Sequence, residues 1–204
     1  MKTLIIYGAG GHGKICSDIA VRMKRWDNIV FYDDYKNSNP NLIHYTEKQI
    51  GDYVSKDTDF FVAIGDNNIR KSKNELLVSL NARIATLIDP SSTIGTNVKI
   101  GTGTVIMPNT VINHGVSIGD GVIINTSSII EHECAISDFV HVSPGAVLCG
   151  SVIVGELSWI GANSTIINNL CITKCVAVGA GAVVVSNIID SGIYIGVPAR
   201  KIQK

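Results

Sequence analysis

From Ile88 onward an aliphatic residue recurs at every sixth position of the chain. Two positions before most of these residues stands a small or β-branched one, such as Val98, Thr104 or Ala146. The aliphatic column is Ile88, Ile94, Ile100, Ile106, Ile112, Ile118, Ile124, Ile130, Ile136, Val142, Leu148, Val154, Ile160, Ile166, Ile172, Val178 and Val184. A six-residue unit of one strand and one turn is typical of a parallel β-helix, in which three units close one triangular coil. We therefore expect both columns to point inward and stack from coil to coil.

The first half of the chain has a different pattern, in which strand and helix signals alternate. The expected elements are strands at Thr3–Tyr7, Asn28–Tyr32, Asp59–Ile64 and Ile84–Ile88 and helices at Lys14–Arg25 and Asn68–Leu80. This order predicts a small parallel sheet with flanking helices. The polar stretch between Asp34 and Asp57 is expected to be a loop with one short helix near Glu47–Val54. We therefore predict a Rossmann-like α/β domain over residues 1–87, followed by an all-β parallel β-helix over residues 88–204.

Composition narrows the range of partners. Lys plus Arg and Asp plus Glu both number 17, so no positive field is available for a nucleic-acid backbone or an anionic membrane. No apolar run approaches the roughly 20 residues of a membrane-spanning helix. The five cysteines lack C-x-x-C spacing, and the first apolar run is too short for a signal peptide. We expect a cytoplasmic protein that acts on small molecules, with no nucleic-acid partner and no membrane insertion.

A glycine-rich turn joins the first expected strand to the first expected helix. Gly8, Gly10 and Gly13 fit G-x-G-x-x-G in the context that lets a backbone approach a pyrophosphate. Asp33 and Asp34 end the second strand, where a carboxylate could accept from a ribose hydroxyl or a base edge. The same motif serves NAD-dependent dehydrogenases, but the short domain leaves little chain for the second half of a dinucleotide fold. Turn glycines without a ligand are the other alternative. The motif favours a nucleotide and does not identify its base.

Three segments together resemble the PglD and NeuD-like group of sugar O- and N-acetyltransferases, whose hexapeptide repeats form left-handed β-helices. They are the turn Gly8–Lys14, the stretch Ile64–Arg70, and Glu131–Cys134 within the repeats. The resemblance covers the whole chain. It implies that the small domain binds the nucleotide end of a nucleotide-linked amino sugar and that the β-helix binds acetyl-CoA. It also implies a left-handed coil, which the period alone does not decide, and a homotrimer with acetyl-CoA sites between neighbouring subunits.

His132 and Glu133 are the candidate catalytic residues. An amine must be uncharged to attack a thioester, and an imidazole with its ordinary pKa of about 6.5 suits the role of base. His132 follows the inward Ile130 by two residues, hence lies at or near a corner of the coil. The resemblance implies that His132 is the general base and that Glu133 orients it. Without the resemblance, a solvated corner histidine would be the default interpretation.

The resemblance also implies the residues that meet acetyl-CoA. His141 would lie against the acetyl group and pantetheine, and Ala162 and Ala180 would meet pantetheine through their backbones. Gly150 follows His132 by one coil, so its N–H could meet the thioester oxygen as negative charge develops. The expected acetyl-CoA-binding residues are therefore His141, Gly150, Ala162 and Ala180.

On the acceptor side, Asn125 matches an asparagine that contacts the sugar near its amine in the PglD-like enzymes. Asparagine also commonly adopts the left-handed turn conformation at such corners, which is the structural alternative. The expected substrate-binding residues are Gly10, Gly11, His12, Gly13, Asp33, Asp34, Gly65 and Asn125.

No metal is expected, and acetyl-CoA is expected as a co-substrate. His114 lies one coil below His132, but its neighbours Asn113 and Gly115 complete no ligand set. Cys134 occupies the inward small-residue column, so we expect it to be a core residue and not a nucleophile. Acetyl transfer would then be direct.

The leading hypothesis is acetyl-CoA-dependent N-acetylation of the 4-amino group of a UDP-linked 4-amino-4,6-dideoxy sugar. Acceptors linked to dTDP or GDP are close variants that the sequence does not exclude. O-acetylation of a sialic acid would use the same His132 on a hydroxyl group. In a third alternative the chain is a trimeric scaffold that binds a nucleotide-sugar without catalysis, and the intact His132–Glu133 pair argues against it.

Overall fold

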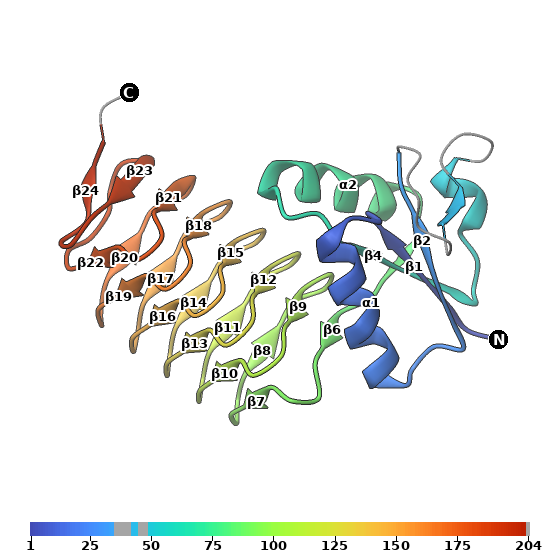
Figure 1. Cartoon of the computed structure of the whole chain (residues 1–204), viewed down its shortest axis with the longest axis horizontal. Helices are drawn as coiled ribbons and strands as arrows, with labels where there is room; N and C mark the ends of the chain where they lie inside the picture. Colours follow the sequence, from blue (N-terminus) through green and yellow to red (C-terminus); the bar gives the residue numbers. More distant parts are fainter. Residues whose placement is uncertain (35–41, 45–48, 203–204) are drawn as a thin grey trace.

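The chain folds into a small α/β domain and a long prism of stacked coils, as Figure 1 shows. The description comes from a computed structural model, which describes residues 1–34, 42–44 and 49–202. No helix among these residues is long and apolar enough to cross a membrane.

The N-terminal domain is a five-stranded parallel sheet with strand order β3-β2-β1-β4-β5. The register of β1 with both neighbours is regular, and the central strands are buried. Its elements are β1 (Thr3–Tyr7), α1 (Gly11–Met23), β2 (Asn28–Tyr32), β3 (Leu42–His44), the 3-10 helix η1 (Ile50–Tyr53), β4 (Thr58–Val62), α2 (Asn67–Ser79) and β5 (Arg83–Ile84).

Three local predictions need correction. Helix α1 begins at Gly11, three residues before the predicted Lys14, because Gly10 is its N-cap and the glycine-rich turn runs directly into the first helical turn. The single strand predicted at Ile84–Ile88 is two strands, and the second of them already belongs to the prism. The predicted helix near Glu47–Val54 is the short η1, and its first two residues lie outside the described part of the chain.

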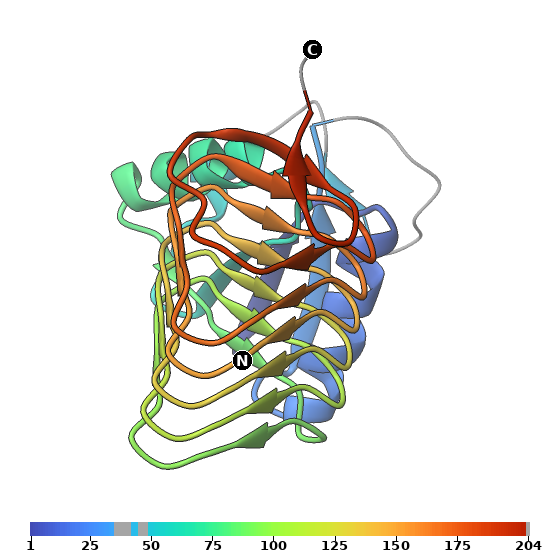
Figure 2. The ribbon, with the colours of Figure 1, turned by 90° about the vertical axis from the view of Figure 1, so that its left-hand side faces the viewer.

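The prism has three faces, and each face is a β-sheet built from parallel strands of successive coils. The eight-stranded sheet contains β6 (Leu87–Ile88), β9 (Val105–Ile106), β12 (Ile123–Ile124), β15 (His141–Val142), β18 (Trp159–Ile160), β21 (Val176–Val178) and β23 (Gly192–Ile195), and β24 (Arg200–Lys201) joins it antiparallel to β23. The six-stranded sheet contains β7 (Thr93–Ile94), β10 (Val111–Ile112), β13 (Ile129–Ile130), β16 (Val147–Leu148), β19 (Thr165–Ile166) and β22 (Val183–Val184). The five-stranded sheet contains β8 (Lys99–Ile100), β11 (Ser117–Ile118), β14 (Ala135–Ile136), β17 (Ile153–Val154) and β20 (Cys171–Ile172). Figure 2 shows the successive coils one behind another.

The interior of the prism confirms the two predicted columns. Ile112, Ile130 and Leu148, which follow one another by one coil, are fully buried, and the small residues Cys134 and Ala146 are buried among them. Each strand pairs in register with the strand one coil away, so identical positions stack along the axis. Such stacking keeps every outward column in line as well, which matters for the site.

The N-terminal domain packs on the outer face of the eight-stranded sheet. Helix α1 contributes Ile19 and Ala20 to a core that also contains Leu87, Val105 and Ile123, the outward residues of the first three strands of that sheet. Farther along the prism the same outward column is no longer covered by α1.

Candidate active site

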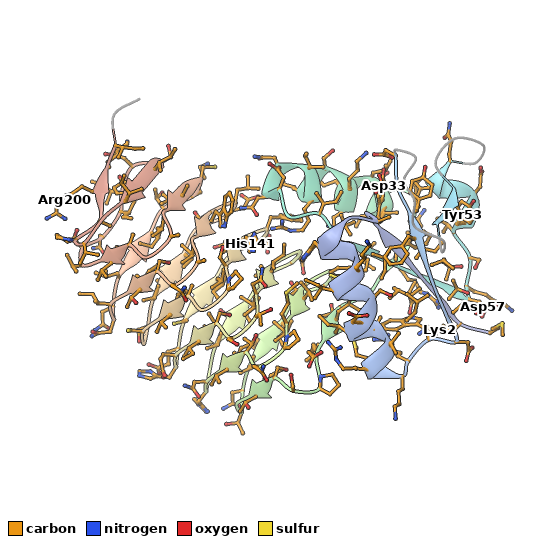
Figure 3. All side chains as sticks on the ribbon, in the orientation of Figure 1. Lys2, Asp33, Tyr53, Asp57, His141 and Arg200 are labelled. Atoms are coloured by element: carbon orange, nitrogen blue, oxygen red, sulfur yellow. The ribbon has the colours of Figure 1, made fainter. Side chains whose placement is uncertain are left out.

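The candidate site begins where the cover of α1 ends. In the outward column of the eight-stranded sheet, Ile123 is followed one coil later by His141, then by Trp159 and Ala177. Ile123 is buried, whereas Trp159 is exposed over 54% of its surface. Figure 3 places His141 on the prism where the N-terminal domain meets it.

His141 is held on several sides. Its imidazole stacks on the Trp159 indole with a centroid distance of 5.8 Å and an interplanar angle of 7°. The Asn125 side chain accepts from the Thr126 N–H through Oδ1, so its Nδ2 faces His141 and donates to Nε2 at 3.1 Å. The Nδ1 proton of the neutral ring then remains for the main chain of Gly65, to which His141 is also hydrogen-bonded. Asn125, Gly65 and His141 therefore form one polar cluster.

The charge state of this cluster follows from its burial. Burial lowers the pKa of His141 to about 3, and the positive charge of Arg70 and the protonated form of His12 act in the same direction. Burial and Arg70 likewise lower the pKa of His12 to about 4. Both rings are neutral at physiological pH, so neither adds a positive charge to the site.

These lowered pKa values predict a loss of stability in mild acid. The unfolded histidines titrate near pH 6.5, so their contribution is fully present above that pH and is lost as the pH falls toward 4. We expect the melting temperature to fall over this window, and less so in a His12→Asn, His141→Asn double variant. Thermal unfolding at fixed protein concentration measures it. An equally steep decline in both proteins would contradict the assigned origin.

A cavity of about 500 Å³ opens beside His141 toward the later coils. Its walls are small or apolar, apart from Ser143, which accepts a hydrogen bond from the Trp159 indole N–H at 2.6 Å. Ala162 and Ala180, both expected to meet pantetheine, line it. An apolar groove with few polar groups suits an extended, mostly aliphatic arm.

The glycine-rich turn has an open face and a closed one. A Cβ at Gly8 would lie 2.8 Å from the Ala63 carbonyl oxygen, and one at Gly13 would lie 2.0 Å from the Gly8 oxygen. These two glycines allow strand and helix to approach closely. Gly10 and Gly11 meet nothing within 4 Å of an added Cβ, so the start of α1 is accessible to a ligand.

Asp33 and Asp34 both have partners within the domain. Asp33 accepts from the Ala9 N–H at 2.8 Å and so helps to fix the glycine-rich turn. Asp34 accepts from the Tyr7 hydroxyl at 2.6 Å and from Lys73 at 2.7 Å. Each carboxylate has further acceptor capacity, so contact with a nucleotide stays a prediction.

His132 and Glu133 lie at the corner between the six-stranded and five-stranded sheets. Their side chains are 60% and 69% exposed, and 3.6 Å separates His132 Nδ1 from Glu133 Oε2. The His132 ring lies over Gly150, where an added Cβ would come within 2.6 Å of Nε2. Only a glycine leaves room for this ring position.

One chain does not bring the two key histidines together. His132 occupies the corner opposite the eight-stranded sheet, whereas His141 and Asn125 belong to that sheet and its edge. The structure therefore groups His12, Gly65, Asn125 and His141, and places His132, Glu133 and Gly150 in a second group.

Two other sequence predictions concern side chains outside these groups. Cys134 is buried, and burial raises the pKa of its thiol to about 11, as suits a core residue. His114 is exposed and hydrogen-bonded to the Thr96 hydroxyl through Nδ1 at 2.8 Å. Within the described residues no group of three or more His, Cys, Asp or Glu side chains could hold a metal ion.

Sequence reasoning gave no role to Trp159 or to Arg70, although Arg70 ends the stretch Ile64–Arg70 that contributes to the resemblance. Trp159 could have been found by taking every eighteenth residue from Leu87 onward. This outward column is aliphatic up to Ile123 and then changes to His141 and Trp159. Arg70 gives no such signal, because an arginine on a helix is usually exposed. It is 1% exposed.

Comparisons with known proteins agree with the fold. The family model of the PglD N-terminal domain matches residues 3–77, and that of the bacterial transferase hexapeptide (six repeats) matches residues 97–132. UDP-N-acetylbacillosamine N-acetyltransferase of Bacillus subtilis (strain 168) is 36% identical over 109 residues. That match spans 51% of this chain and 50% of the relative, so the chain matches about half the length of this curated protein.

Solved structures match over nearly the whole chain. The acetyltransferase domain of PglB from Neisseria gonorrhoeae FA1090, in complex with acetyl coenzyme A, is 35% identical with a TM-score of 0.94, and 98% of this chain and 99% of that one are covered. PerB from Caulobacter crescentus, in complex with CoA and GDP-perosamine, is 28% identical with a TM-score of 0.90, and 100% and 98% are covered.

The fold and the repeats define an acyltransferase of the hexapeptide-repeat class, built on a left-handed parallel β-helix. Within that class, the small α/β domain in front of the prism is the distinguishing part. The chain belongs to the PglD-like family of sugar acetyltransferases.

Proposed function

We propose that this chain transfers the acetyl group of acetyl-CoA to the 4-amino group of a UDP-linked 4-amino-4,6-dideoxy sugar. The observation that carries the proposal is the meeting of His12 and Gly65 with Asn125 and His141 at the mouth of an apolar cavity. Acetyl-CoA in the Neisseria structure and CoA with GDP-perosamine in the Caulobacter structure support it. The name of the Bacillus relative favours UDP. The cytoplasm supplies acetyl-CoA and is the compartment that the proposal implies.

Each part of the ligands has a surface that suits it. The open glycines Gly10 and Gly11 lie at the N-terminus of α1, where backbone N–H groups and the helix dipole favour a diphosphate. Asp33 and Asp34 stand at the adjoining strand end for the nucleoside. The sugar then extends toward Asn125, and pantetheine occupies the apolar cavity.

The proposed chemistry is a direct transfer. The uncharged amine attacks the thioester carbonyl carbon, and His132 takes the proton that the nitrogen gives up. The Gly150 N–H stabilises the developing oxyanion. The carbon–sulfur bond then breaks, the CoA sulfur leaves as a thiolate, and the proton held by His132 returns to it. Glu133 orients His132 throughout.

The geometry of one chain implies that the complete site lies between chains. His132 is on the corner opposite the sheet that carries His141, which favours its supply by a neighbouring subunit. We therefore propose a homotrimer held together by the prism faces, in which each site combines His141 of one subunit with His132 of the next. Sedimentation should show a trimer, and an active monomer would contradict the arrangement.

Mixed trimers test the shared site directly. His132→Ala and His141→Ala chains, each impaired alone, should regain activity at low acetyl-CoA when refolded or expressed together. Random assortment in a closed ring places a wild-type His141 next to a wild-type His132 at about one quarter of the sites, so recovery should approach about 25% of wild type. Mixing His132→Ala with Glu133→Gln chains is the control, because both changes fall on the same side of the interface. No recovery in the first mixture would place both histidines in one subunit.

The His141→Ala substitution should act mainly on acetyl-CoA binding. We expect the KM for acetyl-CoA to rise by about 10-fold, because the ring that packs on Trp159 at the mouth of the cavity is lost. Steady-state kinetics with both substrates varied would show it. An unchanged KM with a lower kcat would instead assign His141 to the chemical step.

The function itself is tested by supplying acceptors. The purified protein, acetyl-CoA and UDP-, dTDP- or GDP-linked 4-amino-4,6-dideoxy sugars should release CoA thiol and yield an N-acetylated product by mass spectrometry, with UDP preferred. Release of thiol only with sialic acid would replace N-transfer by O-transfer. Binding of an amino-sugar nucleotide without thiol release would show a scaffold.

A further inference from the structure

Arg70 is a buried cation at the junction of the two domains. It lies in the first half of α2, and its side chain is 1% exposed. Its guanidinium reaches oxygen atoms of both domains at once. It donates to the carbonyls of Ile64 and Gly65 at 3.0 Å, of Gly121 at 2.7 Å, of Phe139 at 2.9 Å and of Val140 at 3.4 Å, and to Asn67 Oδ1 at 2.8 Å.

These hydrogen bonds go to neutral oxygens. Asp66 is the acid whose charge acts on Arg70, but its carboxylate caps α2 by accepting from the Ile69 N–H. Burying a cation without a bonded carboxylate is unfavourable, and an aliphatic side chain would fill the same space at lower cost. A planar fork that grips several carbonyls in fixed directions is what only arginine provides. The burial of Arg70 is therefore better explained by the directed hydrogen bonds of its guanidinium than by the filling of space in a core.

The carbonyls that Arg70 holds adjoin the candidate site. Val140 immediately precedes His141, and the Gly65 main chain is hydrogen-bonded to the His141 ring. Next to Arg70, Asn67 donates through Nδ2 to the carbonyls of Leu157 and Ser158 at 3.1 Å, one coil farther on. The start of α2 is thus attached to three successive coils of the prism.

A second group of contacts between the domains lies near the start of the prism. Arg22 of α1 donates to Asp89 at 2.7 Å, near the first coil, and an apolar core surrounds that region. They hold the domains together but do not reach the loop 64–67. Arg22 is therefore a matched control: an arginine of the same domain, hydrogen-bonded across the same junction, away from the site.

We propose that Arg70 is a positioning residue that couples the nucleotide-binding domain to the acetyl-transfer site. It fixes the loop 64–67 against His141, so that a sugar whose nucleotide is bound on the N-terminal domain presents its amine at the correct depth on the prism. The inference rests on the proposed function for its kinetic consequences, but not for its structural ones.

The test compares Arg70→Lys, which keeps the charge and loses the fork, with Arg22→Gln. For Arg70→Lys we expect the Kd for UDP alone and the KM for acetyl-CoA to stay within about twofold of wild type. The KM for the UDP-linked amino sugar should rise by about tenfold and kcat should fall by about 10–100-fold, since misplacement by about 1 Å has effects of this size. Arg22→Gln should lower the melting temperature without this split. Asn67→Ala should show the same pattern of changed and unchanged constants more weakly. It replaces Arg70→Lys in the test if Arg70→Lys does not fold.

Hydrogen exchange gives a readout that needs no substrate. The amides of residues 64–67 and 139–141 should exchange faster in Arg70→Lys and unchanged in Arg22→Gln. If the wild type acetylates no acceptor, the proposed function fails while this comparison still decides the coupling. Unchanged exchange at both segments would overturn the role of Arg70. So would a loss of UDP affinity as large as the loss for the sugar nucleotide, because Arg70 would then shape the nucleotide site alone.

Discussion

Replacing His132 with Ala is expected to lower kcat by roughly 10²–10⁴, the usual range for the loss of a general base. The KM for acetyl-CoA should change little, because His132 lies at an exposed corner apart from the cavity that suits pantetheine. Stability should also be nearly unchanged, since a side chain that is 60% exposed contributes little to the core. Initial rates with the UDP-linked amino sugar measure the effect.

The pH dependence distinguishes loss of a base from other damage. An amine acceptor deprotonates by itself as the pH rises, so His132→Ala should recover part of its activity in alkaline buffer, whereas the wild type should gain much less. Glu133→Gln should cost less than His132→Ala, because a neutral amide still lies beside the ring. Full activity of His132→Ala at neutral pH would overturn the mechanism and leave the fold unaffected.

Gly150→Ala is expected to lower kcat by about 10²-fold while the protein folds normally. The new Cβ would fall 2.5 Å from His132 Cε1, so the ring must leave its position over Gly150. It can do so at little cost in stability because it is largely solvent-exposed. The base is then misplaced relative to the amine, and displacements of about 1 Å have effects of this size. Kinetics and thermal unfolding of the same preparation separate the two effects.

A double variant shows whether this displacement is the cause. If Gly150→Ala acts only through the imidazole, then His132→Ala with Gly150→Ala should be no slower than His132→Ala alone. A further loss in the double variant would assign Gly150 a second role, which is the role expected of an oxyanion-hole donor. Either result is informative, but a fully active Gly150→Ala would exclude both.

The prism could be predicted because its inward-facing residues repeat at a fixed period in the sequence. Positions such as Ile112 and Ile130 repeat every coil, and each repeat supports the same interpretation. The α/β domain was predictable to within a few residues for a different reason, since its buried strands are short apolar runs bounded by turns. The start of α1 was missed because Gly10 forms no side-chain cap that a sequence could reveal.

The candidate site was harder to predict because it depends on which corner of the prism lies opposite which of its three sheets. Motifs named His132 and His141 as candidates, but only the coil geometry shows that they lie on opposite sides of one prism. The hydrogen bonds of Asp33 and Asp34 within the domain were also not predictable, because they depend on the exact approach of β2 to the glycine-rich turn. Arg70 was missed because its partners are carbonyls, which carry no sequence signal.

The distance between the proposed nucleotide-binding region and the proposed acetyl-transfer groove is set by the number of coils between them along the outward column of the eight-stranded sheet. Three strands, ending at Ile123, lie beneath α1, and the next, with His141, lies beyond the cover of that helix. Inserting one 18-residue coil between Ile123 and His141 would move the proposed acetyl-transfer groove one strand spacing, about 4.8 Å, from the N-terminal domain. In a protein with this fold, adding or removing coils therefore changes the distance between the two ligands only in multiples of one strand spacing. Acceptors of intermediate length must be accommodated by the loops and not by the prism.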